Sequence, residues 1–88
     1  MNSYYVNAVI DGDTFNVTPN WAYRGQSGSR VRLRGVNAAE LGHRGGLAAK
    51  RRLSAMVLRK RVTLRNIQRI NWDRLVCDVY VGASKVRI

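Results

Sequence analysis

The sequence predicts a small, mainly β (α+β) domain, a five-stranded barrel with one helix between its third and fourth strands. Five short segments alternate apolar and polar residues, which is the period of a half-buried strand. One segment, from Leu47 to about Lys60, instead carries apolar residues at helical spacing. This order of elements is typical of the OB-fold, in which closing the sheet removes exposed strand edges. An open α+β sheet is the alternative.

The first two predicted strands, residues 5–10 and 14–18, read as a hairpin. Asp11 and Gly12 lie between them, and Asp-Gly is a preferred pair for a tight turn. Residues 19–28 are polar and contain proline and glycine, so we expect a loop there. The apolar contacts expected for this loop are Trp21 and Tyr23.

The third predicted strand carries a row of arginines. Arg30, Arg32 and Arg34 alternate with Val31, Leu33 and Gly35. A strand would therefore present three guanidinium groups on one face. Residues 37–46 break the pattern and contain three glycines, which favours a mobile connection over a second domain.

The last two predicted strands follow the helix. Residues 61–70 begin with alternation, but the phase slips at Asn66 and Ile67, which indicates a bulge or a strong bend. Residues 75–81 alternate again and form the fifth strand.

Size and charge limit the functions that are open to the chain. Its 88 residues suit a single domain, 1–88, with a small core. Its formal net charge of +11 favours polyanionic partners, DNA or RNA first. A basic surface that serves solubility or membrane attraction is the alternative.

Cysteine and histidine are too few for two common kinds of site. The only cysteine, Cys77, excludes an internal disulfide, and with the only histidine, His43, it cannot form a four-ligand zinc site. We expect Cys77 to be a core residue and His43 a solvated loop residue. No stretch resembles a signal peptide or a membrane span, so we expect a soluble, cytoplasmic protein, with secretion open if a leader was removed.

The few acidic residues gather near features that suit phosphate chemistry. Hydrolysis of a phosphodiester needs a hard cation or guanidinium groups to neutralise the phosphate, and a carboxylate to orient or deprotonate water. Asp13, Arg32 and Glu40 supply these groups, and Arg74 offers a second guanidinium. The acids beside Gly12 also suit a hairpin turn without any catalytic role.

Three motifs in this order resemble those of the staphylococcal nuclease-like (thermonuclease) family. They are DGDT at 11–14, RLRGVNAAE at 32–40 and, more loosely, WDRLVCDVYV at 72–81. The resemblance covers nearly the whole chain. It implies an OB-type barrel that cleaves DNA or RNA with calcium.

The resemblance also implies roles for individual residues. Asp13 matches the principal metal carboxylate, Asp11 an acid beside the metal, and the carbonyl of Ala38 a backbone ligand. Glu40 matches the carboxylate that activates water, and Arg32 and Arg74 match the arginines that bind phosphate. The candidate substrate contacts are Trp72, at an aromatic position of the family, and Arg34, which shares a strand face with Arg32.

Several positions depart from the family pattern. Asn37 replaces the second metal carboxylate, so calcium affinity is expected to fall. Ala39 replaces a proline, and Asp73 replaces a glycine beside Arg74, where it is able to pair with that guanidinium. The chain also stops soon after the fifth strand, whereas family members continue. The sequence therefore leaves open whether the domain is truncated at its C-terminus and whether it forms a homodimer.

Three functions remain open at this point. The first is a calcium-dependent nuclease. The second is a catalytically weak or inactive nucleic-acid-binding module of the same family, with Trp21, Tyr23 or Trp72 stacking on bases. The third is a domain that recognises acidic proteins, which the retained acids and arginines disfavour.

Overall fold

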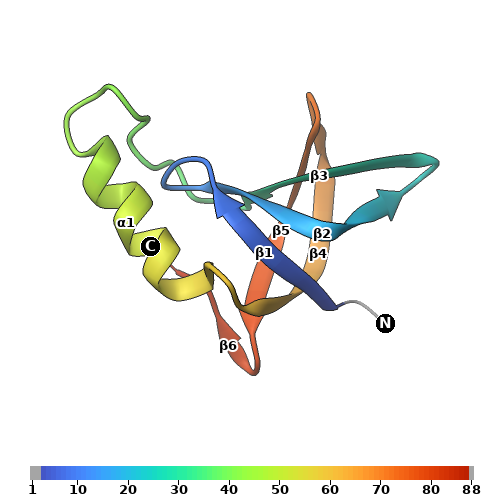
Figure 1. The fold of residues 1–88 in the computed structure, drawn as a ribbon. Helices are drawn as coiled ribbons and strands as arrows, with labels where there is room; N and C mark the ends of the chain where they lie inside the picture. Colours follow the sequence, from blue (N-terminus) through green and yellow to red (C-terminus); the bar gives the residue numbers. More distant parts are fainter. Residues whose placement is uncertain (1–2, 88) are drawn as a thin grey trace.

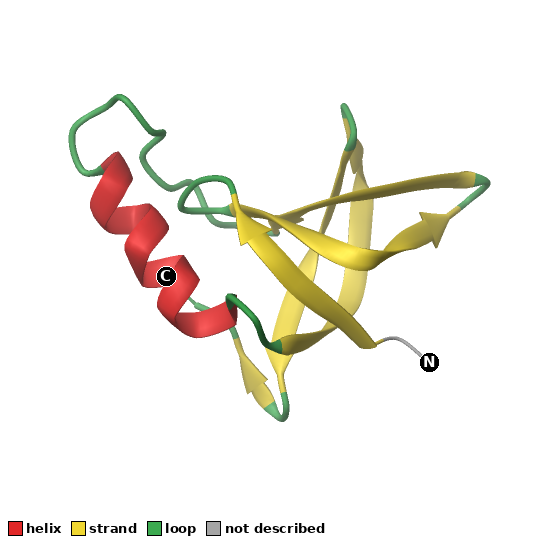
Figure 2. Ribbon diagram, viewed as in Figure 1, coloured by secondary structure: helices red, strands yellow, loops and turns green. Residues whose placement is uncertain are grey.

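The strands close into a barrel, as the sequence predicts. The computed structural model describes residues 3–87. The strands are β1 (Ser3–Val9), β2 (Thr14–Tyr23), β3 (Gln26–Leu33), β4 (Arg61–Asn71), β5 (Arg74–Val81) and β6 (Ser84–Lys85). The helix, α1 (Gly46–Val57), lies between β3 and β4 in the chain and beside one end of the barrel (Figures 1 and 2). The predicted OB-type architecture is confirmed.

The barrel closes where β3 meets β5. The sheet runs in the order β3-β2-β1-β4-β5-β6, and β3 pairs in parallel with β5. Val31 lies beside Leu75 in this pairing, and Leu33 lies beside Cys77. Closure therefore hydrogen-bonds the edge that β3 would otherwise expose.

The core fills the barrel with side chains from alternate strand positions. Its largest fully buried members include Trp21, Phe15, Leu33, Leu53, Leu75, Val17, Val31 and Val79. Leu53 comes from α1, whose apolar face covers the barrel end. Cys77 is fully buried, as predicted for a core residue, and burial raises the pKa of its thiol to about 12. The Cys77 thiol therefore stays protonated at neutral pH.

Strand β4 bends in the middle, as the slip in its pattern predicts. Asn66 has a φ of 53°, and the pairing with β5 shifts register between Arg65 and Arg69. Such a bulge raises the local twist. It lets one strand pair with β1 near its start and with β5 along the rest of its length.

The prediction of a loop at residues 19–28 is wrong. Strand β2 continues to Tyr23 and β3 begins at Gln26, so this segment extends the hairpin to a turn at Arg24 and Gly25. Trp21 is only 2% exposed, lies opposite Gly28, and donates a hydrogen bond to the Arg30 carbonyl at 2.8 Å. Trp21 therefore holds β2 against β3 and is not a loop residue.

Other element boundaries also differ from the prediction. The first hairpin has no two-residue Asp-Gly turn, because residues 10–13 connect β1 and β2 and the amides of Ile10 and Asp11 both donate to the Thr14 carbonyl. Strand β3 ends at Leu33, and α1 ends at Val57. Strand β6 was not predicted. Within residues 3–87 no helix has the length and apolar character needed to cross a membrane.

Candidate functional site

Asp13 lies where the first connection enters β2, and its carboxylate is held by neighbouring strands. The side chain is buried, with the residue 7% exposed. The Thr14 hydroxyl donates to Asp13 Oδ1 at 2.9 Å, and Arg32 Nη2 lies 3.4 Å from Asp13 Oδ2. Thr14 and Arg32 are register partners on β2 and β3. The pairing of these strands therefore brings the acid and the guanidinium together.

A second carboxylate lies beside the first. Asp11 Oδ1 accepts the backbone N–H of Asp13 at 3.1 Å. Burial is the largest influence that raises the pKa of Asp13, and hydrogen bonding and repulsion from Asp11 raise it further, against the lowering influence of Thr14 and Arg32. Folding thus disfavours the charged form of Asp13, and a bound cation would relieve this.

The connection between β3 and α1 passes over this pair. The Ala38 N–H donates to Asp13 Oδ2 at 3.4 Å. A Cβ on Gly12 would lie 2.7 Å from the Ala38 Cβ and 2.5 Å from the Ala49 Cβ of α1. Only glycine fits there, because the first connection, the second connection and the helix meet at this point. Segments distant in the sequence are therefore joined at Asp13.

Glu40 and Asn37 belong to the same connection but are less enclosed. The Glu40 side chain is 79% exposed, and its Oε2 lies 4.0 Å from His43 Nε2. Asn37 is also exposed. His43 is exposed, as predicted for a solvated loop residue. The structure thus brings together Asp11, Asp13, Arg32 and Ala38, and leaves Glu40 two residues beyond the Ala38 contact.

Arg74 and Trp72 lie at the start of β5 and the turn before it. Arg74 is half-buried, and its register partner on β3 is Arg30, two residues from Arg32. Trp72 is 89% exposed and has a φ of 63°. No ion pair joins Asp73 to Arg74 in the described part of the chain. Arg74 is therefore free of the pairing that the sequence suggested.

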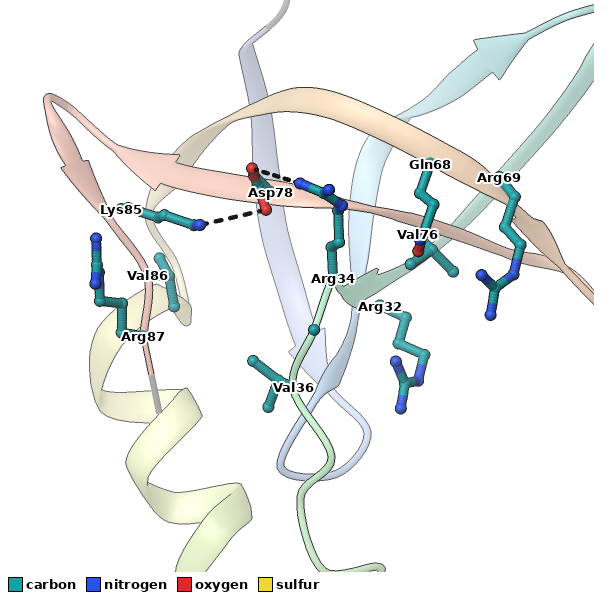
Figure 3. Close-up of a pocket in the computed structure, with 11 residues that line it drawn as sticks. Arg32, Arg34, Val36, Gln68, Arg69, Val76, Asp78, Lys85, Val86 and Arg87 are labelled. Carbon is teal, nitrogen blue, oxygen red and sulfur yellow. Dashed lines mark ion pairs between the residues drawn. The ribbon is translucent and has the colours of Figure 1, made fainter.

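A cavity of about 570 Å³ opens beside Arg32 (Figure 3). Arg32, Gln68 and Arg69 line one side and Lys85 and Arg87 the other, with Arg34 and Asp78 between them. Asp78 is 5% exposed. Its carboxylate accepts a 2.8 Å hydrogen bond from Asn66 and lies 3.5 Å from Arg34 Nη1 and 3.6 Å from Lys85 Nζ. The Asn66 hydrogen bond, followed by the Lys85 and Arg34 charges, lowers the pKa of Asp78 against the effect of burial.

Sequence reasoning missed most of this cavity. Arg34 was predicted as a substrate contact, and it is paired with Asp78 in the cavity wall. Apart from Arg32, the other charged and polar lining groups escaped notice because they come from β4, β5, β6 and the segment after β6. Asp78 gave a usable signal, since it is one of only five acids and lies within an apolar strand.

Calcium prefers six to eight oxygen ligands. Asp11 and Asp13 offer neighbouring carboxylates, and the Asn37 amide and the Ala38 carbonyl come from the connection that contacts Asp13. Among residues 3–87 no three acidic, histidine or cysteine side chains form a metal-binding group. These four residues offer oxygen donors of the kind that calcium takes, and water would have to supply the remaining ligands of any ion bound there.

Comparison with known proteins assigns no family. No family model matches the chain, and no curated protein matches it significantly. The functional argument therefore rests on the geometry of the site.

Proposed function

We propose that this protein is a calcium-dependent nuclease that hydrolyses phosphodiester bonds of DNA or RNA. The observation that supports it most is the contact of Asp13 with Arg32 and with the backbone of Ala38. This contact brings together the Asp13 carboxylate, which is suited to bind a cation, and the Arg32 guanidinium, which is suited to bind a phosphate. It also joins both groups to the connection that carries Glu40. The net charge of +11 would attract the substrate.

Arg32 is the proposed phosphate ligand closest to Asp13. Its side chain is 21% exposed, so its charge is less screened than that of a fully exposed arginine. A guanidinium in this position stabilises the negative charge that grows on the phosphate oxygens in the transition state. Arg74, on the strand that pairs with β3, is the proposed second phosphate ligand.

Glu40 is the proposed general base. Its carboxylate would orient or deprotonate the attacking water, and such contacts are often loose before substrate binds. Gly42 and Gly45, with φ of 87° and 83°, shape the connection that carries it. Bound calcium would add positive charge against the phosphate oxygens. Asp13, Asp11, Asn37 and the Ala38 carbonyl are the proposed ligands.

A catalytically inactive nucleic-acid-binding module is the second candidate, and a specific observation favours it. Both Asp13 carboxylate oxygens already have protein partners, and Glu40 faces His43 at the surface. Trp72 is exposed and available to stack on a base. Trp21 is excluded from that role because it is buried.

A cleavage assay on plasmid and single-stranded DNA, with calcium or with chelator, tests the proposal. Calcium-dependent cleavage is expected, and Arg32→Gln should slow it by about 100- to 1,000-fold because a charge-stabilising group is lost. Arg30→Gln is the matched control, since Arg30 is an exposed arginine on the same strand and contacts neither Asp13 nor Ala38. Equal losses in both variants would contradict the role of Arg32.

Glu40→Gln tests the general base. Cleavage should fall by about 100-fold or more, while binding of uncleaved DNA in chelator stays unchanged. Asp73→Asn removes one exposed acid from another connection and serves as the control. Tight binding with no cleavage by the unaltered protein would replace the nuclease by the binding module.

A further inference from the structure

The cavity beside Arg32 continues toward the tip of the long hairpin. A second hollow, of about 280 Å³, shares Gln68 and Arg69 with the first and is lined by Tyr23 and Arg24. The two hollows adjoin at these shared residues, and we call them together the basic groove. Its cationic side chains are Arg24, Arg32, Arg34, Arg69, Lys85 and Arg87.

Positive charge in the basic groove exceeds what its acid neutralises. Asp78 is the acid that lines it, and this carboxylate is already shared by Arg34 and Lys85. In the part of the chain that the structure describes, Arg24, Arg69 and Arg87 have no carboxylate within 4.0 Å. A concave surface with excess charge of one sign concentrates the field and draws in a polyanion.

Arg32 lies between the other cations of the basic groove. Arg69 lies toward the hairpin side of Arg32, and Lys85 and Arg87 lie across the cavity (Figure 3). At the hairpin end the Arg24 guanidinium lies 5.3 Å from the centre of the Tyr23 ring. An aromatic ring beside cations is the usual platform for a base of a single strand.

We propose that the basic groove holds a single nucleic-acid strand on both sides of the phosphate at Arg32, so that the protein acts within a chain. This proposal rests on the proposed function, because Arg32 belongs both to the site and to the groove. Phosphates flanking the central one lie against Arg69 in one direction and against Arg87 in the other. A chain of several nucleotides therefore binds and reacts better than a dinucleotide.

Strand binding is measured in chelator, where no cleavage occurs, with labelled oligothymidylates of 2, 4, 8 and 12 nucleotides. Affinity should rise with length, and Arg69→Gln and Arg87→Gln should each weaken binding of the 12-mer by about five- to tenfold at 50 mM salt. Each change should also lower the slope of log affinity against log salt by about 0.7. The matched controls are Arg51→Gln and Arg52→Gln, on the exposed face of α1.

The outcomes separate this proposal from the nuclease itself. Equal losses in the groove and helix variants, or an affinity that does not rise with length, would overturn the groove even if calcium-dependent cleavage is observed. Length-dependent binding that Arg69→Gln weakens, without cleavage in calcium, would keep the groove and reject the nuclease. Displacement of the 12-mer by polyglutamate at equal charge concentration would assign the groove to an acidic protein segment. Thermal unfolding of each variant confirms that the fold is intact.

Discussion

Asp13 and Asp78 are the two buried acids among residues 3–87, and their surroundings shift their pKa values in opposite directions. Asp78 accepts a hydrogen bond from Asn66 and lies near two cations, so folding favours its charged form. Asp13 is crowded by Asp11 and by burial, so folding disfavours its charged form. The contrast fits a structural role for Asp78 and agrees with the functional role that we propose for Asp13.

Asp78→Asn should destabilise the protein. The variant loses the charge that Arg34 and Lys85 face, at a cost of about 1–2 kcal/mol at pH 7, because those cations are partly exposed. The folded-state pKa of Asp78 lies below its ordinary value, so its stabilising effect is present above about pH 4 and is lost as pH falls through the folded value. Urea unfolding at pH 7 and pH 3 should show the gap between the two proteins closing at low pH.

Asp13→Asn should have the opposite effect on stability. The pKa of Asp13 is higher in the folded protein than in the unfolded chain, because burial disfavours the charged carboxylate. The protein is therefore more stable at low pH, where Asp13 is neutral, and loses this stability as pH rises through the folded-state pKa. A neutral amide avoids this loss, and the variant should be about 0.5–1 kcal/mol more stable than the unaltered protein at pH 7, with cleavage abolished. Urea unfolding at pH 7 that shows a clear loss of stability would instead make Asp13 a structural residue.

At the scale of elements, alternation of side chains predicted most strands because each has one face in the barrel core. The prediction failed at residues 19–28, where Pro19 and several polar residues indicated a loop. There the strands are held by Trp21 against Gly28 and by cross-strand hydrogen bonds, which are contacts between segments and leave no periodic signal. Local pattern finds a strand where apolar residues recur at every second position, and it carries no signal for contacts between segments.

The candidate site shows the same division. Short motifs in the sequence pointed to Asp13, Arg32 and Glu40, and in the structure Arg32 Nη2 lies 3.4 Å from Asp13 Oδ2. The basic groove was not foreseen, because Arg34 reaches Asp78 only after β3 pairs with β5. Arg69 joins the groove from β4 beyond the bulge. The contacts among these groove residues depend on how the barrel closes. The sequence predicts that the barrel closes, but it does not predict which residues pair across the strands.

Gly12→Ala tests the meeting point of the first connection, the second connection and α1. The added methyl group would collide with the side chains of Ala38 and Ala49, so the fold should lose about 1–3 kcal/mol and the site should be displaced. Adding Ala49→Gly removes the collision with the Ala49 side chain. Glycine inside a helix itself destabilises the fold by about 1 kcal/mol, and the Ala49→Gly single variant measures this cost. A double-mutant cycle from urea unfolding should give a favourable coupling between the two changes, and additivity would mean that the turn does not contact the helix.

The whole molecule is dominated by its charge. Sixteen Lys and Arg side chains face five acids, and ion pairs among the described residues draw on Asp13, Asp78 and, through His43, Glu40. Most cations therefore repel one another in a molecule with a radius of gyration of only 12.0 Å. Repulsion of this kind opposes the compact state and is screened by salt.

Salt should therefore stabilise the fold while weakening strand binding. Between 20 and 300 mM sodium chloride, the melting temperature should rise by about 4–8 °C for each kcal/mol of repulsion that is screened. Over the same range the affinity for a single strand should fall steeply, because the release of counterions into more concentrated salt is less favourable. Scanning calorimetry and oligonucleotide titration on one preparation measure both trends. A melting temperature that falls with salt would mean that the ion pairs at Asp13 and Asp78 outweigh the repulsion among the cations.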